Sequence, residues 1–100
     1  MVYCTSMLLQ IKRLSRDERR YYEEFVGQHK ALKSESLLED FLVGILTPAE
    51  MKQIIRRLQI VKKLKKGVPQ RQIAEDLGVG IATVTRGARE LGRGRFECIK

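Results

Sequence analysis

Apolar residues recur at intervals of three and four along most of the chain, a spacing that places them on one face of an α-helix. The longest such stretch lies between Thr47 and Gly67. Its apolar positions are Met51, Ile54, Ile55, Leu58, Val61 and Leu64. Thr47 is a favourable N-cap, Pro48 suits the first helical position, and Glu50 completes a capping box. Gly67 suits the end of the helix, so the pattern predicts one long helix here.

Two shorter helices are predicted before it. Ser15 and Glu18 have the spacing of a capping box, which marks the start of the first helix. Its apolar positions run towards Leu32 and comprise Tyr21, Tyr22, Phe25 and Val26. Ser34 or Ser36 can cap the second helix. The apolar side of that helix comprises Leu37, Leu38, Phe41, Leu42 and Ile45.

Residues 70–91 have the pattern of a helix-turn-helix, with one helix over 70–77 and another from about 81 to 91. Pro69 stands at the entrance of the first of these helices. Ala74 is small enough for two helices to cross closely, and Gly78 adopts the positive φ of the turn at low cost. The inner faces of the pair are predicted to be Ile73, Leu77, Val79 and Val84.

These elements predict an all-α fold of about five helices with a C-terminal helix-turn-helix. One hundred residues allow one domain, which we place at residues 15–91. Residues 1–14 are expected to be an N-terminal extension. Residues 92–100 begin with Gly92-Arg93-Gly94-Arg95, which is expected to break the last helix, and they are expected to form a basic C-terminal tail.

The charge of the chain is unevenly distributed. Residues 1–47 contain seven Lys or Arg and seven Asp or Glu, whereas residues 48–100 contain thirteen and five. The second part therefore carries the whole net charge of +8. A neutral half beside a strongly basic half suggests an assembly surface joined to a surface that binds a polyanion.

The second helix of the helix-turn-helix begins with small, polar and basic side chains, from Ala82 to Arg86, which suit base edges and phosphates. We predict that Ile81, Ala82 and Thr83 face base edges and that Arg71 reaches a guanine. The predicted DNA-binding residues are Gln70, Arg71, Gly80, Ile81, Ala82, Thr83, Thr85 and Arg89. The alternative is a helical module that docks a protein instead.

The first three helices are more apolar than a DNA-binding pair requires. They bury their apolar faces either in a small bundle within one chain or against a second copy. A helix-turn-helix that reads a palindromic site normally works as a dimer, because one module covers one half-site. The sequence therefore predicts a homodimer bound to double-stranded DNA.

Other functional classes find little support in the sequence. No apolar stretch approaches the roughly 20 residues of a membrane span, and the start of the chain does not resemble a secretory signal. Cys4 and Cys98 lack the spacing of metal ligands and are expected to be reduced thiols in the cytoplasm. His29 is the single histidine, and we expect no catalytic role for it. Neither an enzyme nor a metal site is predicted.

The arrangement of these motifs resembles the tryptophan repressor family. The resemblance covers roughly residues 15–91 and is most specific in the GIATVTRG segment, residues 80–87, and in the sequence Leu46-Thr47-Pro48. Further matching positions are Arg57, Ile60, Val61, Gly67, Gln70, Arg71, Leu77 and Gly78. The resemblance implies an intertwined homodimer in which the amino-terminal helices interlock and the helix-turn-helix pairs form two DNA-reading heads.

The resemblance also implies an L-tryptophan corepressor between the long helix and the recognition helix. By analogy, Arg86 and Thr47 would hold the carboxylate, Arg57 would cover the indole, and Gly87 would leave space beside the ring. The sequence departs from the family at Glu90, where the family has a serine near the ammonium group. It departs again at Gly44, where the family has a leucine.

Two readings of the corepressor positions stay open. Glu90 either pairs with the ammonium group of a ligand or bridges to Arg57 or Arg86 and fills the site. In the second case the arginines serve only phosphates and ion pairs. The joint between Gly67 and Gln70 is also one residue shorter than the family pattern.

After Leu91 the final helix of the family is missing or reduced to residues 96–99. The expected function is that of a cytoplasmic bacterial transcription regulator. It would act as a repressor with L-tryptophan or another amino acid as effector, or as a ligand-independent DNA-binding protein of the same fold.

Overall fold

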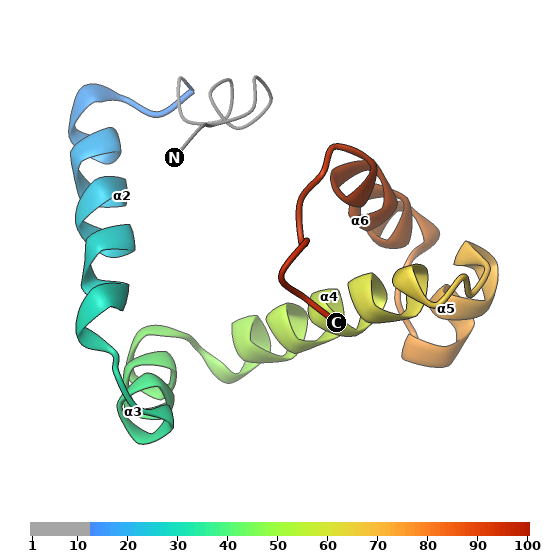
Figure 1. The fold of residues 1–100 in the computed structure, drawn as a ribbon, viewed down its shortest axis with the longest axis horizontal. Coiled ribbons are helices and arrows are strands. Elements are labelled where there is room, and N and C mark those ends of the chain that lie inside the picture. Colours follow the sequence, from blue (N-terminus) through green and yellow to red (C-terminus); the bar gives the residue numbers. More distant parts are fainter. Residues whose placement is uncertain (1–12) are drawn as a thin grey trace. The chain divides into compact units, whose positions relative to one another are not determined.

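The computed structural model describes residues 13–100, and within this range it contains five α-helices, one 3-10 helix and no strand (Figure 1). The elements are α2 (Arg16–Gln28), η1 (His29–Ala31), α3 (Glu35–Ile45), α4 (Pro48–Lys65), α5 (Gln70–Leu77) and α6 (Ile81–Gly92). The prediction of an all-α fold is confirmed. The chain forms two compact units, which divide between Gly44 and Ile45. Cys4 and most of the expected N-terminal extension lie outside the described residues.

In the first unit, α2 begins with the capping box expected from the sequence. The Glu18 backbone N–H donates to Ser15 Oγ at 3.1 Å, and the Ser15 backbone N–H donates to Glu18 Oε1 at 3.0 Å. The helix ends at Gln28, and the chain continues as η1. The apolar pattern that runs towards Leu32 therefore includes a tighter turn and is not one continuous α-helix.

Helix α3 is capped by Ser34, the first of the two candidates, because Ser34 Oγ accepts a hydrogen bond from the Leu37 backbone N–H at 3.2 Å. Three rings connect α3 to the preceding elements. The Phe41 centroid lies 6.0 Å from that of Phe25 and 5.6 Å from that of His29. His29 Nδ1 also donates to the Phe25 carbonyl oxygen at 2.9 Å, so His29 takes part in local packing.

In the second unit, α4 also begins as predicted. The Glu50 backbone N–H donates to Thr47 Oγ1 at 3.2 Å, and the Thr47 backbone N–H donates to Glu50 Oε1 at 2.9 Å, with Pro48 at the first helical position. The helix ends at Lys65, and Gly67 follows with a φ of 80°. A positive φ at this point suits glycine, which has no Cβ to clash with the backbone.

The core of the second unit joins one residue from each of its helices. Ile60 of α4, Ile73 of α5 and Val84 of α6 form a buried cluster, with no more than 1% of any of them exposed. The half-buried apolar residues packed against this cluster are Leu64, Val68, Ala74, Leu77 and Val79. The predicted inner face of the helix-turn-helix is confirmed.

Helix α4 buries only part of the face that its apolar pattern predicted, since Val61 is buried and Leu64 packs on the core as predicted. Ile60 is fully buried, although it lies outside the predicted apolar positions of this helix. Ile54, Ile55 and Leu58 belong to that pattern and are exposed. The core therefore uses the C-terminal end of α4, where α5 and α6 pack. No helix within residues 13–100 is long and apolar enough to cross a membrane.

Candidate nucleic-acid interface

The turn between α5 and α6 has the backbone geometry of a helix-turn-helix. Gly78 ends α5 in the left-handed region, with a φ of 63° and a ψ of 38°. The Val79 backbone N–H donates to the Ala74 carbonyl oxygen at 3.1 Å, which closes the end of α5. Gly80 is then the N-cap of α6 and makes no side-chain capping bond. The backbone N–H groups that begin α6 therefore have no side-chain cap.

Helix α6 has a buried face and an exposed face. Val84 is completely buried, and Gly87 and Ala88 are half-buried on the same side. The exposed residues of the helix are Ile81, Ala82, Thr83, Thr85, Arg86, Arg89 and Gly92. They include every residue of α6 that the sequence analysis assigned to DNA. A single exposed face therefore combines small side chains at the start of the helix with two arginines farther along.

A hydrogen bond between side chains links the two helices outside their apolar core. Thr85 Oγ1 of α6 donates to Gln70 Oε1 of α5 at 3.0 Å. Both residues were predicted to contact DNA, but no spacing rule connects two residues 15 positions apart, so this bond was not predicted. Because the Gln70 carbonyl oxygen accepts from Thr85, the group that Gln70 offers outward is its amide nitrogen, a donor.

Helix α5 also carries charged residues, Arg71 near its start and Asp76 near its end. Arg71 is exposed in the first turn of α5. Asp76, near the other end of the helix, accepts a hydrogen bond from Gln72 Nε2 at 2.8 Å and lies 3.9 Å from Lys63 Nζ of α4. The negative charge of Asp76 is thus partly offset by a lysine of the neighbouring helix.

The residues assigned to a corepressor lie on three parts of the chain. Thr47 Oγ1 is occupied by the cap of α4. Arg57 on α4 and Arg86 on α6 are exposed, and neither makes an ion pair within residues 13–100. Gly44 lies in α3, at the end of the first unit.

The surface of Gly87 is already in contact with α4. A Cβ built on Gly87 would lie 3.0 Å from Ile60 Cγ2 and 3.7 Å from Leu64 Cδ1. The resemblance implied that this glycine leaves space for an indole ring. In the structure, the side chain of Ile60 occupies the space beside Gly87, and the absence of a Cβ lets α6 approach α4 closely.

The carboxylate of Glu90 is held by the segment that follows α6. Arg93 Nη1 donates to Glu90 Oε1 at 2.9 Å, and Arg95 Nε donates to Glu90 Oε2 at 2.6 Å. Only 13% of the Glu90 side chain is exposed. The hydrogen bond from Arg95 is the main cause that lowers the pKa of this carboxyl. Of the two alternatives left open by the sequence, the bridge from Glu90 to Arg57 or Arg86 is not formed, because Arg93 and Arg95 are the partners.

The sequence analysis treated Arg93 and Arg95 only as part of a basic tail. The spacing of three residues between Glu90 and Arg93 was the one available signal, and it concerned only this pair.

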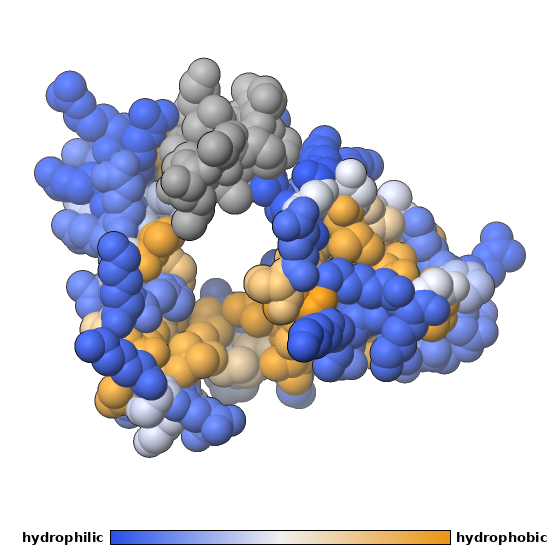
Figure 2. Space-filling view, viewed as in Figure 1, coloured by the Kyte–Doolittle hydropathy of each residue, from blue (hydrophilic) through white to orange (hydrophobic). Residues whose placement is uncertain are grey.

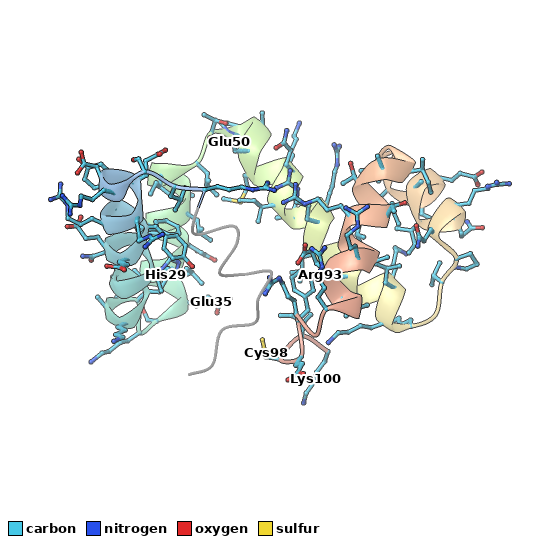
Figure 3. All side chains as sticks on the ribbon, turned by 90° about the horizontal axis from the view of Figure 1, so that it is seen from above. His29, Glu35, Glu50, Arg93, Cys98 and Lys100 are labelled. Atoms are coloured by element: carbon cyan, nitrogen blue, oxygen red, sulfur yellow. The ribbon has the colours of Figure 1, made fainter. Side chains whose placement is uncertain are left out.

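Figure 3 shows Arg93 on the same part of the chain as Cys98 and Lys100, which are both exposed. Within residues 13–100, no three His, Cys, Asp or Glu side chains are placed to hold a metal ion.

Comparison with known proteins points to one family. The sequence model of the family described as Trp repressor protein matches residues 20–97. A Trp operon repressor homolog of Vibrio vulnificus is 51% identical over 51 residues, which are 50% of each chain. The match thus spans only half the length of this relative.

Two relatives match over a longer range. A Trp operon repressor homolog of Vibrio parahaemolyticus is 39% identical over 75 residues, which cover 74% of this chain and 73% of the relative. Another, from Actinobacillus succinogenes, is 38% identical over 72 residues, or 71% of each chain. No solved structure gives a significant match.

Proposed function

The chain belongs to the Trp repressor family, whose members are DNA-binding transcription regulators and not enzymes, and on this premise we propose that it binds double-stranded DNA and regulates transcription. The proposal rests on helix α6, which has one buried face and one exposed face. Val84 anchors one face in the core, and the opposite face presents Ile81, Ala82 and Thr83 at the start of the helix. Helices of this kind read the major groove with their first residues.

We assign the reading of bases to the first turn of α6 and to Arg71. Thr83 hydrogen-bonds base edges, and Ile81 and Ala82 make apolar contacts such as those with the thymine methyl group. Arg71 is exposed in α5 and reaches a guanine with two hydrogen bonds. These contacts distinguish one sequence from another.

Phosphate binding falls to donors around the same face. A Cβ at Gly80 would meet no atom within 4 Å, so this residue leaves the start of α6 open to the DNA backbone. The N–H groups that begin α6 suit a phosphate. Gln70 donates through its amide nitrogen, because its oxygen accepts from Thr85. Arg89 completes the set, and Thr85 acts by holding Gln70, because its single hydroxyl proton is donated to Gln70 Oε1. These contacts position the protein without selecting a sequence.

The protein acts as a homodimer in this proposal. Several large apolar side chains are exposed within the described chain, which is unusual for a monomer. Those of α2 and α3 are Tyr21, Phe25, Val26, Leu37, Leu38, Val43 and Ile45, and those of α4 are Ile54, Ile55 and Leu58 (Figure 2). A second copy would cover these residues. Two recognition helices would then read the two halves of a palindromic site.

We further propose that the protein binds its site without an amino-acid corepressor. Two observations support this choice over control by L-tryptophan. The space beside Gly87 is taken by Ile60, and both oxygens of Glu90 accept hydrogen bonds from arginines of the chain itself. Because the relatives are Trp operon repressor homologs of bacteria, we propose repression as the output and the bacterial cytoplasm as the location.

A salt titration tests whether the partner is DNA. DNA binding through phosphates should give a plot of log K against log salt that falls with a slope of about −0.9 per phosphate contact. Arg89→Ala should reduce that slope by about one, whereas Arg20→Ala, an equal change of charge on α2, should leave it unchanged. A weak affinity without salt dependence would favour a module that docks a protein.

A further inference from the structure

The segment after α6 folds back against α4 and α6, and four side chains take part in the bonds that hold it there. Glu90 accepts hydrogen bonds from Arg93 and Arg95, and Lys65 Nζ donates to the carbonyl oxygens of Phe96 and Ile99. Figure 1 shows this segment leaving α6 and ending beside α4. The segment therefore bridges the C-terminal ends of two helices that are separate in sequence.

The backbone of the segment also has a defined conformation. Gly94 has a φ of 87° and Phe96 a φ of 65°, so the chain reverses its direction within a few residues. A positive φ is unfavourable for a phenylalanine and requires support from surrounding contacts. The Arg93 and Arg95 backbone N–H groups both donate to the Glu90 carbonyl oxygen, at 3.1 and 3.3 Å. Arg95, Phe96 and Ile99 are only partly exposed.

The Glu90 carboxylate is the anchor of this arrangement. It lies in the last turn of α6, and each of its two oxygens accepts a hydrogen bond from an arginine. Hydrogen bonds between ionised partners are stronger than neutral ones, and the low exposure of Glu90 and Arg95, 13% and 18%, limits competition from water. Each oxygen thus already has a charged partner from the chain itself.

The position of α6 depends on contacts near both of its ends. Val84 fixes the beginning of the helix in the core, and Gly87 fixes its middle against Ile60. The tail fixes its end through Glu90. Because an α-helix moves as a rigid rod, a change of its tilt at Glu90 also displaces Ile81, Ala82 and Thr83.

We infer that residues 93–99 are an intramolecular clasp that holds α6 at the angle needed to read DNA, and that Glu90 is its positioning residue. The clasp joins α4 to α6, as a ligand between the two helices would. The role of the clasp in reading DNA rests on the proposed function. The existence of the clasp does not, because the protection of its amides can be measured without DNA.

Glu90→Gln tests the inference, with Glu97→Gln as the matched control because Glu97 is exposed and carries the same charge. Either substitution makes the protein more basic, which by itself tightens DNA binding. We expect Glu90→Gln to weaken binding to a duplex selected from a random pool, on the order of tenfold, with little change in salt slope. Glu97→Gln should bind at least as tightly as the wild-type protein. Equal or tighter binding by Glu90→Gln would overturn the inference.

Hydrogen exchange of the full-length protein separates this test from that of the proposed function. In Glu90→Gln, the amides of residues 88–95 should exchange faster, while those of α5 remain as protected as in the wild type. Lys65→Met should have the same effect through the other attachment, whereas Lys66→Met, a change of an adjacent exposed lysine, should not. Unchanged exchange in both clasp variants refutes the clasp. Faster exchange with no DNA binding by the wild type would support the clasp and refute the proposed function.

Discussion

Gly87 of α6 and Ile60 of α4 lie so close that a methyl group on the glycine would stand 3.0 Å from Ile60 Cγ2. Ile60 is 1% exposed and has no room to turn away into solvent. A glycine is required here by the approach of two helices and not by a positive φ, since Gly87 lies inside an α-helix. The close approach of the recognition helix to its supporting helix thus requires the absence of a Cβ at Gly87.

Gly87→Ala should therefore destabilise the protein. Overpacking costs about 1–3 kcal/mol, and the higher helix propensity of alanine offsets about 1 kcal/mol of it. We expect a net loss of roughly 1 kcal/mol in the free energy of unfolding, measured with urea. Gly44→Ala is the control, because a Cβ at Gly44 in α3 meets nothing within 4 Å. A Gly87→Ala protein as stable as the wild type would show that Ile60 moves aside freely.

Arg71→Ala should weaken binding to a selected duplex by about 1–3 kcal/mol and relax the preference at one base pair, because a guanine loses its two hydrogen bonds. Competition assays with single-base variants of the duplex measure both effects. If affinity for specific and for random DNA falls equally, Arg71 contacts the backbone instead.

Phe41→Ala should weaken the homodimer. Phe41 is half-buried in one chain and packs against Phe25 and His29. If the partner chain completes its burial, truncation to alanine should cost on the order of 3–5 kcal/mol. Unfolding should then depend strongly on protein concentration. Glu39→Ala, at an exposed charged side chain of the same helix, is the control. A folded wild-type monomer at micromolar concentration in a sedimentation run would contradict the dimer.

L-tryptophan at millimolar concentration should leave DNA affinity unchanged and give no heat in calorimetry. The reason is that Ile60 already fills the space beside Gly87 and that the tail occupies Glu90. The opposite result would be tighter DNA binding that disappears in Arg57→Ala and Arg86→Ala. By linkage, DNA would then tighten tryptophan binding by the same factor.

Acid should remove the contribution of the capping box that begins α4. The hydrogen bond from the Thr47 backbone N–H, followed by that of its side chain, lowers the pKa of Glu50. A lowered pKa in the folded state means that the ionised carboxylate stabilises the fold at neutral pH, and that this contribution disappears as the pH falls through the folded pKa. Glu50→Gln should thus be less stable than the wild type at pH 7, and the difference should shrink as the pH falls below the ordinary pKa of a glutamate.

Thermal unfolding as a function of pH measures this effect. Glu24→Gln, at an exposed position of α2, is the control. The difference in stability between this variant and the wild type should stay the same as the pH falls. If Glu50→Gln were less stable than the wild type by the same amount at every pH, the ionised form of the carboxylate would not be what stabilises the cap.

The features that the sequence alone determined are local. The capping boxes of Ser15 with Glu18 and of Thr47 with Glu50 join residues three positions apart, and the turn at Gly78 needs only a residue that tolerates a positive φ. Helical spacing of apolar residues also predicted the inner face of the helix-turn-helix. Such features follow from neighbouring residues, because a single helical turn brings them together.

The tertiary structure decided which groups meet from distant parts of the chain. Ile60 lies outside the apolar pattern of α4, yet it is buried because α5 and α6 pack on that side. Thr85 and Gln70 are 15 residues apart, and Lys65 is 31 residues from Phe96, so no spacing rule connects them. Glu90 had several possible partners, and the reversal of the chain at Gly94 and Phe96 brought Arg95 to it. Side chains far apart in sequence become partners only when the packing of helices and turns sets the distance between them.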